Sequence, residues 1–285
     1  MKKRTISVIL LFLFAFLQVN ATGLSGDVIY IQEKSWGLLN KPIWADSTLY
    51  AQFAVFLPEN HCVSTANWDG YTAFWEIQND SLFLQKIEVC IYDKKELLKD
   101  STLTLEAEQL KTVFAPYYKQ GKIHARWYTG ELRAAQGELI RYVHSGFNRN
   151  TETEQIITLQ NGLVLQSEIY HNYKKSGLTL KDAQHEIIER FPWSLFPEYK
   201  GWRFSFYIRN LQVTEDGHLS DCDVELLYIK SENEKVAGNN HAATEAFKET
   251  LKTIYPWEVL YIHNQFTTSN TNFVMPIQEK NDNKQ

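Results

Sequence analysis

One short string in the sequence approaches a metal-binding motif. Residues His185 to Glu189 read His-Glu-Ile-Ile-Glu on a segment with helical periodicity. The zinc motif H-E-x-x-H requires a second histidine at the fifth position, because two imidazoles must converge on one ion while the glutamate acts as general base. Here the fifth residue is a glutamate, and none of the eight histidines has another two or four residues away. We therefore interpret the string as a solvated helix face, and we predict neither a metal site nor a cofactor.

The acidic residues offer two further kinds of chemistry. Asp221 and Asp223 lie on one side of a predicted strand, as in some metal-dependent glycosyl transfer sites. Cys222 points to the opposite, apolar side, so we expect both acids on the solvated face. Acid–base hydrolysis would instead need two carboxylates a few ångströms apart across a cleft. The glutamates of the first half that could form such a pair are Glu131, Glu138, Glu152 and Glu154.

These carboxylates do not identify a catalytic residue. Their spacing along the chain leaves open whether any two of them meet, and an acidic surface also scatters glutamates. The sequence contains no G-x-S-x-G elbow, P-loop or G-x-G-x-x-G fingerprint. We assign no catalytic residue, and a carbohydrate-active or other hydrolytic enzyme with its site in the first half is kept as an alternative.

Aromatic residues, 14% of the chain, provide another way to bind a partner. Trp68 stands beside the turn signal Asp69-Gly70, so we expect its ring to be accessible. An exposed ring of this kind stacks on a sugar face or anchors a protein partner. Trp75 alternates with Tyr71 and Ile77 and is expected to be buried. Trp68 is therefore a candidate for contacting a protein or a carbohydrate.

The three cysteines are Cys62, Cys90 and Cys222. Cys62 and Cys90 bracket one candidate hairpin and could form a disulfide, which would leave Cys222 unpaired. The alternative is three buried thiols that pack as small hydrophobic side chains. Sequence alone does not supply the Cα separation that would decide between them.

The first 21 residues have the pattern of a secretory signal. A basic start, Lys2 to Arg4, precedes the apolar run Val8 to Leu17, and Ala21 ends a small-residue cleavage site. The run is short of the roughly 20 residues that a membrane-spanning helix needs. We therefore expect cleavage and export to the periplasm or cell envelope, with no membrane span in the mature chain.

Loss of the signal removes three basic residues and takes the formal net charge from −5 to −8. An acidic chain lacks the basic footprint that binds phosphate backbones. Nucleic-acid binding and adhesion to anionic lipid are both disfavoured.

Residues 22–175 are predicted to form a mainly-β domain of hairpins or a meander. Alternation marks strands at 71–78 and 81–92, where a bulge near Gln85 would reconcile a change of parity. Asn161-Gly162 between two apolar runs is a strong hairpin signal. Helices are expected from Glu106 to Phe114 and from Lys94 to Lys99.

From residue 176 the pattern becomes α-β-β-α-β-β. Thr179 and Asp182 have the capping-box spacing at the start of an amphipathic helix, and Asp216-Gly217 marks a turn between two alternating strands. A second amphipathic helix ends at Pro256, and two short strands follow. We predict an α+β protein with a small domain at 176–280 and a polar tail at 281–285.

Residues 191–277, within this small domain, resemble the C-terminal domain of TonB and its relatives, the periplasmic energy transducers. The order and spacing of several short features carry the resemblance. These features are Phe196-Pro197, the strand–turn–strand Leu211 to Asp221, the Ala-rich helix start Ala242 to Ala246, Tyr255-Pro256-Trp257, and the final strand Phe273 to Ile277. The chain has seven scattered prolines and no long Pro-rich spacer, so the resemblance favours binding over energy transduction.

The resemblance implies that an edge of the sheet pairs with a short peptide. The last predicted strand, Asn270 to Ile277, contains Pro276, which sheets tolerate mainly at edges. Phe273 and Met275 would face one side and Val274 the other. We therefore expect a non-catalytic envelope binding or scaffolding protein that engages a protein or peptide partner through this strand.

We predict that the exported chain begins at Thr22 and is soluble, because the apolar run is too short to serve as an anchor. Intact-mass measurement of the exported protein tests this. A mass that still includes residues 1–21, with the protein in the membrane pellet, would contradict it.

Overall fold

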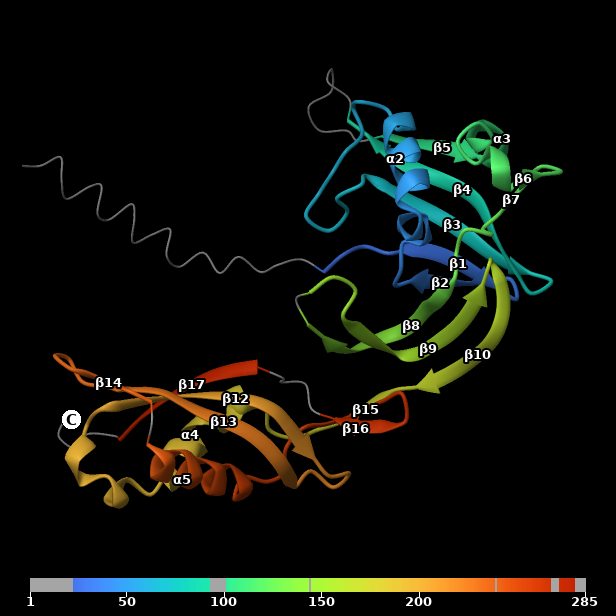
Figure 1. Ribbon diagram of the computed structural model, residues 1–285. Helices are drawn as coiled ribbons and strands as arrows, with labels where there is room; N and C mark the ends of the chain where they lie inside the picture. The colour runs from blue at the N-terminus through green and yellow to red at the C-terminus, as the bar shows by residue number, and fades with distance from the viewer. Residues whose placement is uncertain (1–22, 93–100, 144, 239, 268–271, 280–285) are drawn as a thin grey trace, which may run out of the picture. The chain divides into compact units, whose positions relative to one another are not determined.

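The computed structural model describes residues 23–92, 101–143, 145–238, 240–267 and 272–279 (Figure 1). The protein is rich in strands, with several sheets and a smaller helical content, so it belongs to a mainly-β α+β class. It divides into two compact units. The first comprises 1–136, 142–149 and 155–169, and the second comprises 137–141, 150–154 and 170–285. The predicted signal, the tail at 281–285 and the helix from Lys94 to Lys99 lie outside the described residues.

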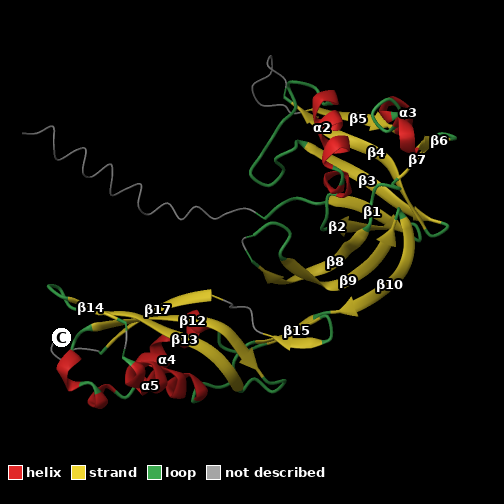
Figure 2. Cartoon of the chain, in the orientation of Figure 1, coloured by secondary structure: helices red, strands yellow, loops and turns green. Residues whose placement is uncertain are grey.

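The first unit is built on one large curved sheet (Figure 2). Its strand order is β10-β9-β8-β2-β1-β3-β4-β7-β6, with β5 also paired to β4. The strands are β1 (Asp27–Ile31), β2 (Lys34–Leu38), β3 (Tyr71–Gln78), β4 (Ser81–Ile91), β5 (Ser101–Glu106), β6 (Tyr118–Lys119), β7 (Lys122–His124), β8 (Gly130–Tyr142), β9 (Arg149–Gln160) and β10 (Leu163–His171). β10 also pairs with β4 through Leu163 and Ser81, so the sheet closes on itself.

The β3–β4 hairpin confirms the strand pattern of the sequence. Asn79 and Asp80 form its two-residue turn with φ of 49° and 54°, a conformation that these residues adopt more readily than most. The register steps from Phe74 opposite Lys86 to Trp75 opposite Leu84, which leaves Gln85 as the extra residue of a bulge. The bulge keeps apolar side chains on the inner face on both sides of it. The predicted hairpin at Asn161-Gly162 joins β9 to β10.

Helices of the first unit differ from the prediction. The structure has an unpredicted helix, α2 (Ser47–Phe56), which Asp46 caps by accepting bonds from two backbone N–H groups. The predicted helix from Glu106 to Phe114 is wrong for most of its length: α3 (Ala107–Leu110) is one turn, followed by η2 (Ala115–Tyr117). β5 takes up the preceding residues through Glu106, because it pairs with β4 and its β-branched residues favour a strand.

The second unit contains two small sheets. One has the order β14-β13-β12-β17 and the other β11-β15-β16. Its strands are β11 (Tyr173–Lys175), β12 (Arg203–Val213), β13 (Leu219–Lys230), β14 (Lys235–Ala237), β15 (Val259–Ile262), β16 (Gln265–Thr267) and β17 (Asn272–Gln278). The helices are α4 (Leu180–Arg190) and α5 (His241–Lys252), with short turns η3 (Trp193–Leu195) and η4 (Pro197–Tyr199). Compared with the predicted order, β14 and β16 are additional strands.

Both long helices of this unit pack on one face of the four-stranded sheet (Figure 1). Thr179 and Asp182 form the predicted capping box at the start of α4. Between helices and sheet lies an aromatic core in which the rings of Phe206 and Phe247 stack 4.0 Å apart, with Phe191 nearby. The opposite face of the sheet carries no helix of the described chain. None of the described helices has the length and apolar character needed to cross a membrane.

The start of the second unit gives a testable difference between two fragments. β11 pairs with β15, Tyr173 stacks on Tyr261 at 4.8 Å, and the Asn172 side chain accepts the His263 N–H at 3.0 Å. A fragment beginning at residue 176 loses these contacts, whereas one beginning at 170 keeps them. We expect both fragments to unfold cooperatively and the longer one to melt at least about 4 °C higher. Equal melting temperatures, or a molten longer fragment, would contradict this.

Candidate functional site

β17 is an edge strand, as the sequence predicted. It pairs with β12 on one side and with no described strand on the other (Figure 1). Met275 and Ile277 are buried against the helices and Phe273 is half-buried, whereas Val274 is 51% exposed. The side chains therefore divide between the two faces of the sheet as expected, and the backbone of one strand margin is open.

Pro276 fixes which backbone groups of β17 face outward. A proline is accommodated in a sheet where its nitrogen faces the open edge, because it has no N–H to give to a neighbour. In an antiparallel pair, alternate residues bond to the same side, so Val274 and Gln278 share this orientation. The Pro276 carbonyl accepts a bond of 2.8 Å from the Gln184 side chain on α4. Pairing along the edge is thus blocked at Pro276 and open at Val274.

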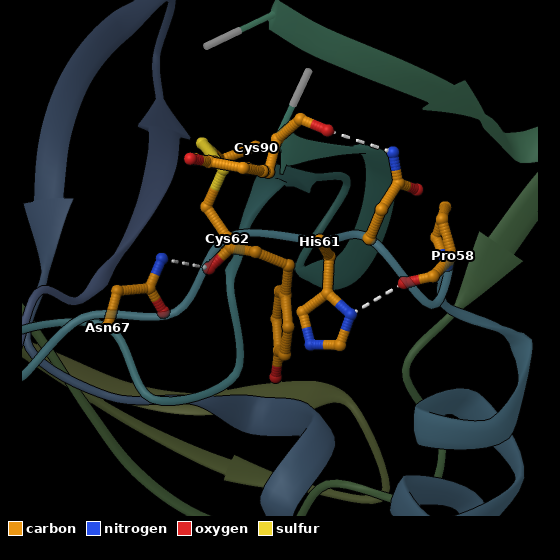
Figure 3. Close-up of a disulfide and its surroundings, with 8 residues drawn as sticks. Pro58, His61, Cys62, Asn67 and Cys90 are labelled. Carbon is orange, nitrogen blue, oxygen red and sulfur yellow. Dashed lines mark hydrogen bonds between the residues drawn. A yellow bond between two sulfur atoms is a disulfide. The ribbon is translucent and has the colours of Figure 1, made fainter. Parts of the chain in front are cut away.

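In the first unit, the predicted candidate Trp68 is 66% exposed, on the connection between α2 and β3. A disulfide joins Cys62 in this connection to Cys90 in β4, with the Cα atoms 5.2 Å apart (Figure 3). The Cys62 N–H also donates to the Cys90 carbonyl at 2.7 Å. The segment that carries Trp68 is thereby tied to the sheet. Cys222 is a buried free thiol, and burial raises its pKa to about 11.

Asp69, next to Trp68, is the centre of a surface cluster that the sequence did not reveal. Its carboxylate accepts one bond from the Trp44 indole at 2.8 Å and another from the Tyr50 hydroxyl at 2.6 Å. The bond to Asp69, together with partial burial, raises the pKa of Tyr50 to about 12. η1 (Pro42–Ala45) and α2, which carry these aromatic residues, thus hold the Trp68 segment at a second point.

A buried ion pair lies deeper in the same unit. The Asp27 carboxylate is 3.0 Å from the Lys41 ammonium, and it also accepts bonds from the Ala73 N–H and the Trp75 indole. Lys41 donates to the Tyr71 carbonyl at 2.8 Å. Burial raises the pKa of Asp27, and the charge of Lys41 opposes that shift. Both side chains are at most 2% exposed, so the pair links β1 and β3 to the segment before η1 and is closed to a substrate.

Glu154 is the only fully buried residue among the four glutamates considered for hydrolysis, and it belongs to the second unit. It accepts bonds from the Asn150 side chain at 3.0 Å, the Thr151 N–H at 3.0 Å and the His263 imidazole. His263 and Asn264 form the tight turn between β15 and β16, with φ of 48° and 64°. Glu154 therefore attaches this turn to β9.

The other chemical candidates lie on the surface. His185 and Glu189 are exposed one helical turn apart, 3.5 Å from each other, and Asp221 and Asp223 are exposed on the outer face of β13. Within the described ranges no cluster of three histidine, cysteine or acidic side chains could hold a metal ion. The geometry thus leaves the β17 edge and the tethered Trp68 segment as the accessible candidates.

No protein-family model, curated protein or solved structure matches this chain. The resemblance of residues 191–277 to TonB C-terminal domains therefore stays a prediction from the order of short motifs in the sequence. Function has to be argued from the site itself.

Replacement of Lys41 by methionine should lower the stability of the first unit by about 3–5 kcal/mol, because Asp27 would be left buried without its counter-charge. Hydrogen exchange of β1 and β3 amides measures the loss. Lys111→Met, which removes an exposed pair with Glu108, is the control and should leave the exchange unchanged. Unaltered protection in Lys41→Met would show that the pair does not stabilise the fold.

Proposed function

We propose that this is an exported, non-catalytic binding or scaffolding protein of the cell envelope. It engages an extended segment of a protein partner along the open edge of β17. The observation that carries this proposal is an edge strand whose outward backbone is open at Val274 and closed at Pro276. An incoming strand gains main-chain hydrogen bonds there, and neighbouring side chains select its sequence.

The proposal includes a domain arrangement. A mainly-β N-terminal domain precedes a small α+β domain similar to the C-terminal domain of TonB. The sequence of helices and strands from α4 to β17 supports this likeness, with β14 and β16 as additions. Domains of that family capture peptides at a sheet edge, and β17 likewise has an outward-facing backbone at Val274 that can accept a strand.

The Trp68 segment is a second contact surface under this proposal. Its ring is exposed, whereas the disulfide and the Asp69 bonds limit the motion of the segment that carries it. An immobilised aromatic ring binds a protein or a sugar face with a small entropic cost. A hydrolytic site in the first half is the weaker alternative, because Asp27 and Glu154 are buried in bonds to protein groups.

Replacement of Val274 by proline should reduce capture of envelope partners at least about fivefold while the domain stays folded. The substitution removes an outward N–H and none of the bonds to β12. Quantitative mass spectrometry of proteins retained by the full chain from an envelope extract measures the effect.

Val274→Ala is the matched control, since it trims the same side chain but keeps the N–H. We expect it to retain the partners that wild type retains. If Val274→Pro retains the same partners at the same level, β17 is not the binding edge.

A further inference from the structure

A hollow of about 750 Å³ lies at one end of the four-stranded sheet of the second unit. Arg203, Lys230 and Gln278 line it, together with Gly201 and the turn 231–233. The turn is ordered by the Ser231 hydroxyl, which accepts the backbone N–H groups of residues 233 and 234. The strand ends and this turn therefore form the walls of the hollow.

Strand register places the three polar side chains in one row. Arg203 of β12 is directly opposite Lys230 on β13 and Gln278 on β17, and all three are exposed. Residues directly opposite in a sheet point to the same face. Here that face is the one without helices, because the neighbouring row of Phe204, Ile229 and Ile277 is buried in the core beneath α4 and α5.

Arg203 and Lys230 are like charges without an acidic partner, and Lys235 of β14 is a third cation directly opposite Lys230. Like charges directly opposite each other destabilise an antiparallel pair. Across the described part of the chain, no carboxylate forms an ion pair with Arg203 or Lys230. Glu232 lies at the margin of the hollow and partly offsets the two positive charges. An anion between the two cations would remove the repulsion and use the planar donors of the arginine.

The hollow lies at the end of the proposed binding edge. Gln278 is the last residue of β17, four residues beyond Val274, or about 13 Å along a strand. Arg203 and Lys230 lie on β12 and β13, about 10 and 14 Å across the strands from a segment paired outside β17, so the segment reaches them by crossing over the end of β17 at Gln278. One extended peptide that pairs with β17 and continues over its end would therefore contact both the strand edge and the hollow.

We propose that this basic hollow binds a carboxylate group at the end of the extended peptide that pairs with β17. The inference rests on the proposed function and deepens it, because it specifies the chemistry of the partner. The peptide pairs parallel to β17, so its C-terminus lies at the Gln278 end of the strand and presents its terminal carboxylate to the hollow.

The first test uses glutarate, a simple dicarboxylate, and does not depend on edge pairing. NMR titration of the full chain should shift the amide signals of Arg203, Lys230 and Gln278. Arg203→Gln and Lys230→Gln should each weaken binding about three- to fivefold, the upper part of the range for exposed charge pairs, and the double variant about tenfold or more.

Arg209→Gln is the matched control. It lies on the same strand, but its charge is already close to Glu225, at 3.9 Å, so its replacement should leave glutarate binding unchanged. The inference is overturned if wild type shows no shifts in this row, or if Arg203→Gln and Lys230→Gln bind glutarate no more weakly than wild type and Arg209→Gln do.

The second test uses an acetylated peptide of alternating threonine and valine that ends in glutamate. It is compared with a peptide of the same length that ends in glutamine amide. Wild type should prefer the acidic peptide about fivefold or more. The Arg203→Gln, Lys230→Gln double variant should lose that preference, whereas Val274→Pro should weaken both peptides alike.

These outcomes separate the two proposals. Equal binding of both peptides by wild type would overturn the carboxylate site and leave edge pairing intact. Binding of glutarate without binding of either peptide would support the anion site and count against the edge.

Discussion

Backbone N–H and C=O groups at the margin of a sheet must be paired, covered or hydrated, and the two units meet this constraint differently. The first sheet closes, because β10 pairs with β4 at Leu163 and the Leu82 N–H donates to the Gly162 carbonyl. The sheet of the second unit stays open at β17. There a proline and the Gln184 side chain block one position and leave the preceding outward position free. The second unit therefore has an exposed strand edge at β17, which is where we propose main-chain pairing.

Buried polar groups hold together elements that are far apart in the sequence. Asp27 and Lys41 link β1, β3 and the segment before η1, and Glu154 joins the β15–β16 turn to β9. Burying a charged group raises the free energy of the folded state unless the group is fully hydrogen-bonded. These clusters therefore contribute more to the choice of one fold than to its stability. A shifted register would leave a carboxyl or ammonium group in the core without its hydrogen-bond partners. We infer that the clusters favour one packing of an otherwise apolar interior.

Local signals in the sequence predicted local structure well. The bulge at Gln85, the turn at Asn161-Gly162 and the capping box at Thr179 depend on residues within a few positions of each other. Of the helix predicted from Glu106 to Phe114, one turn is present as α3, and Glu106 belongs to β5 because that strand pairs with β4. The sequence did not single out Asp27, and it offered Glu154 only as one of four glutamates for a hydrolytic pair or an acidic surface, since nothing near either residue reveals its partners. Those partners are brought together only by tertiary structure.

The basic row on the second sheet depends on one extra residue. The register of β12 and β13 changes between Ser205, opposite Tyr228, and Phe206, opposite Leu226, so Leu227 is accommodated as a bulge. Strict alternation from the buried Leu226 would turn Lys230 toward the helices. The bulge reverses that parity, buries Ile229 and places Lys230 beside Arg203 on the open face. A lysine in the aromatic core would be strongly unfavourable, and the bulge avoids this by placing Ile229 there instead. As a consequence, two cations lie side by side at one end of the four-stranded sheet.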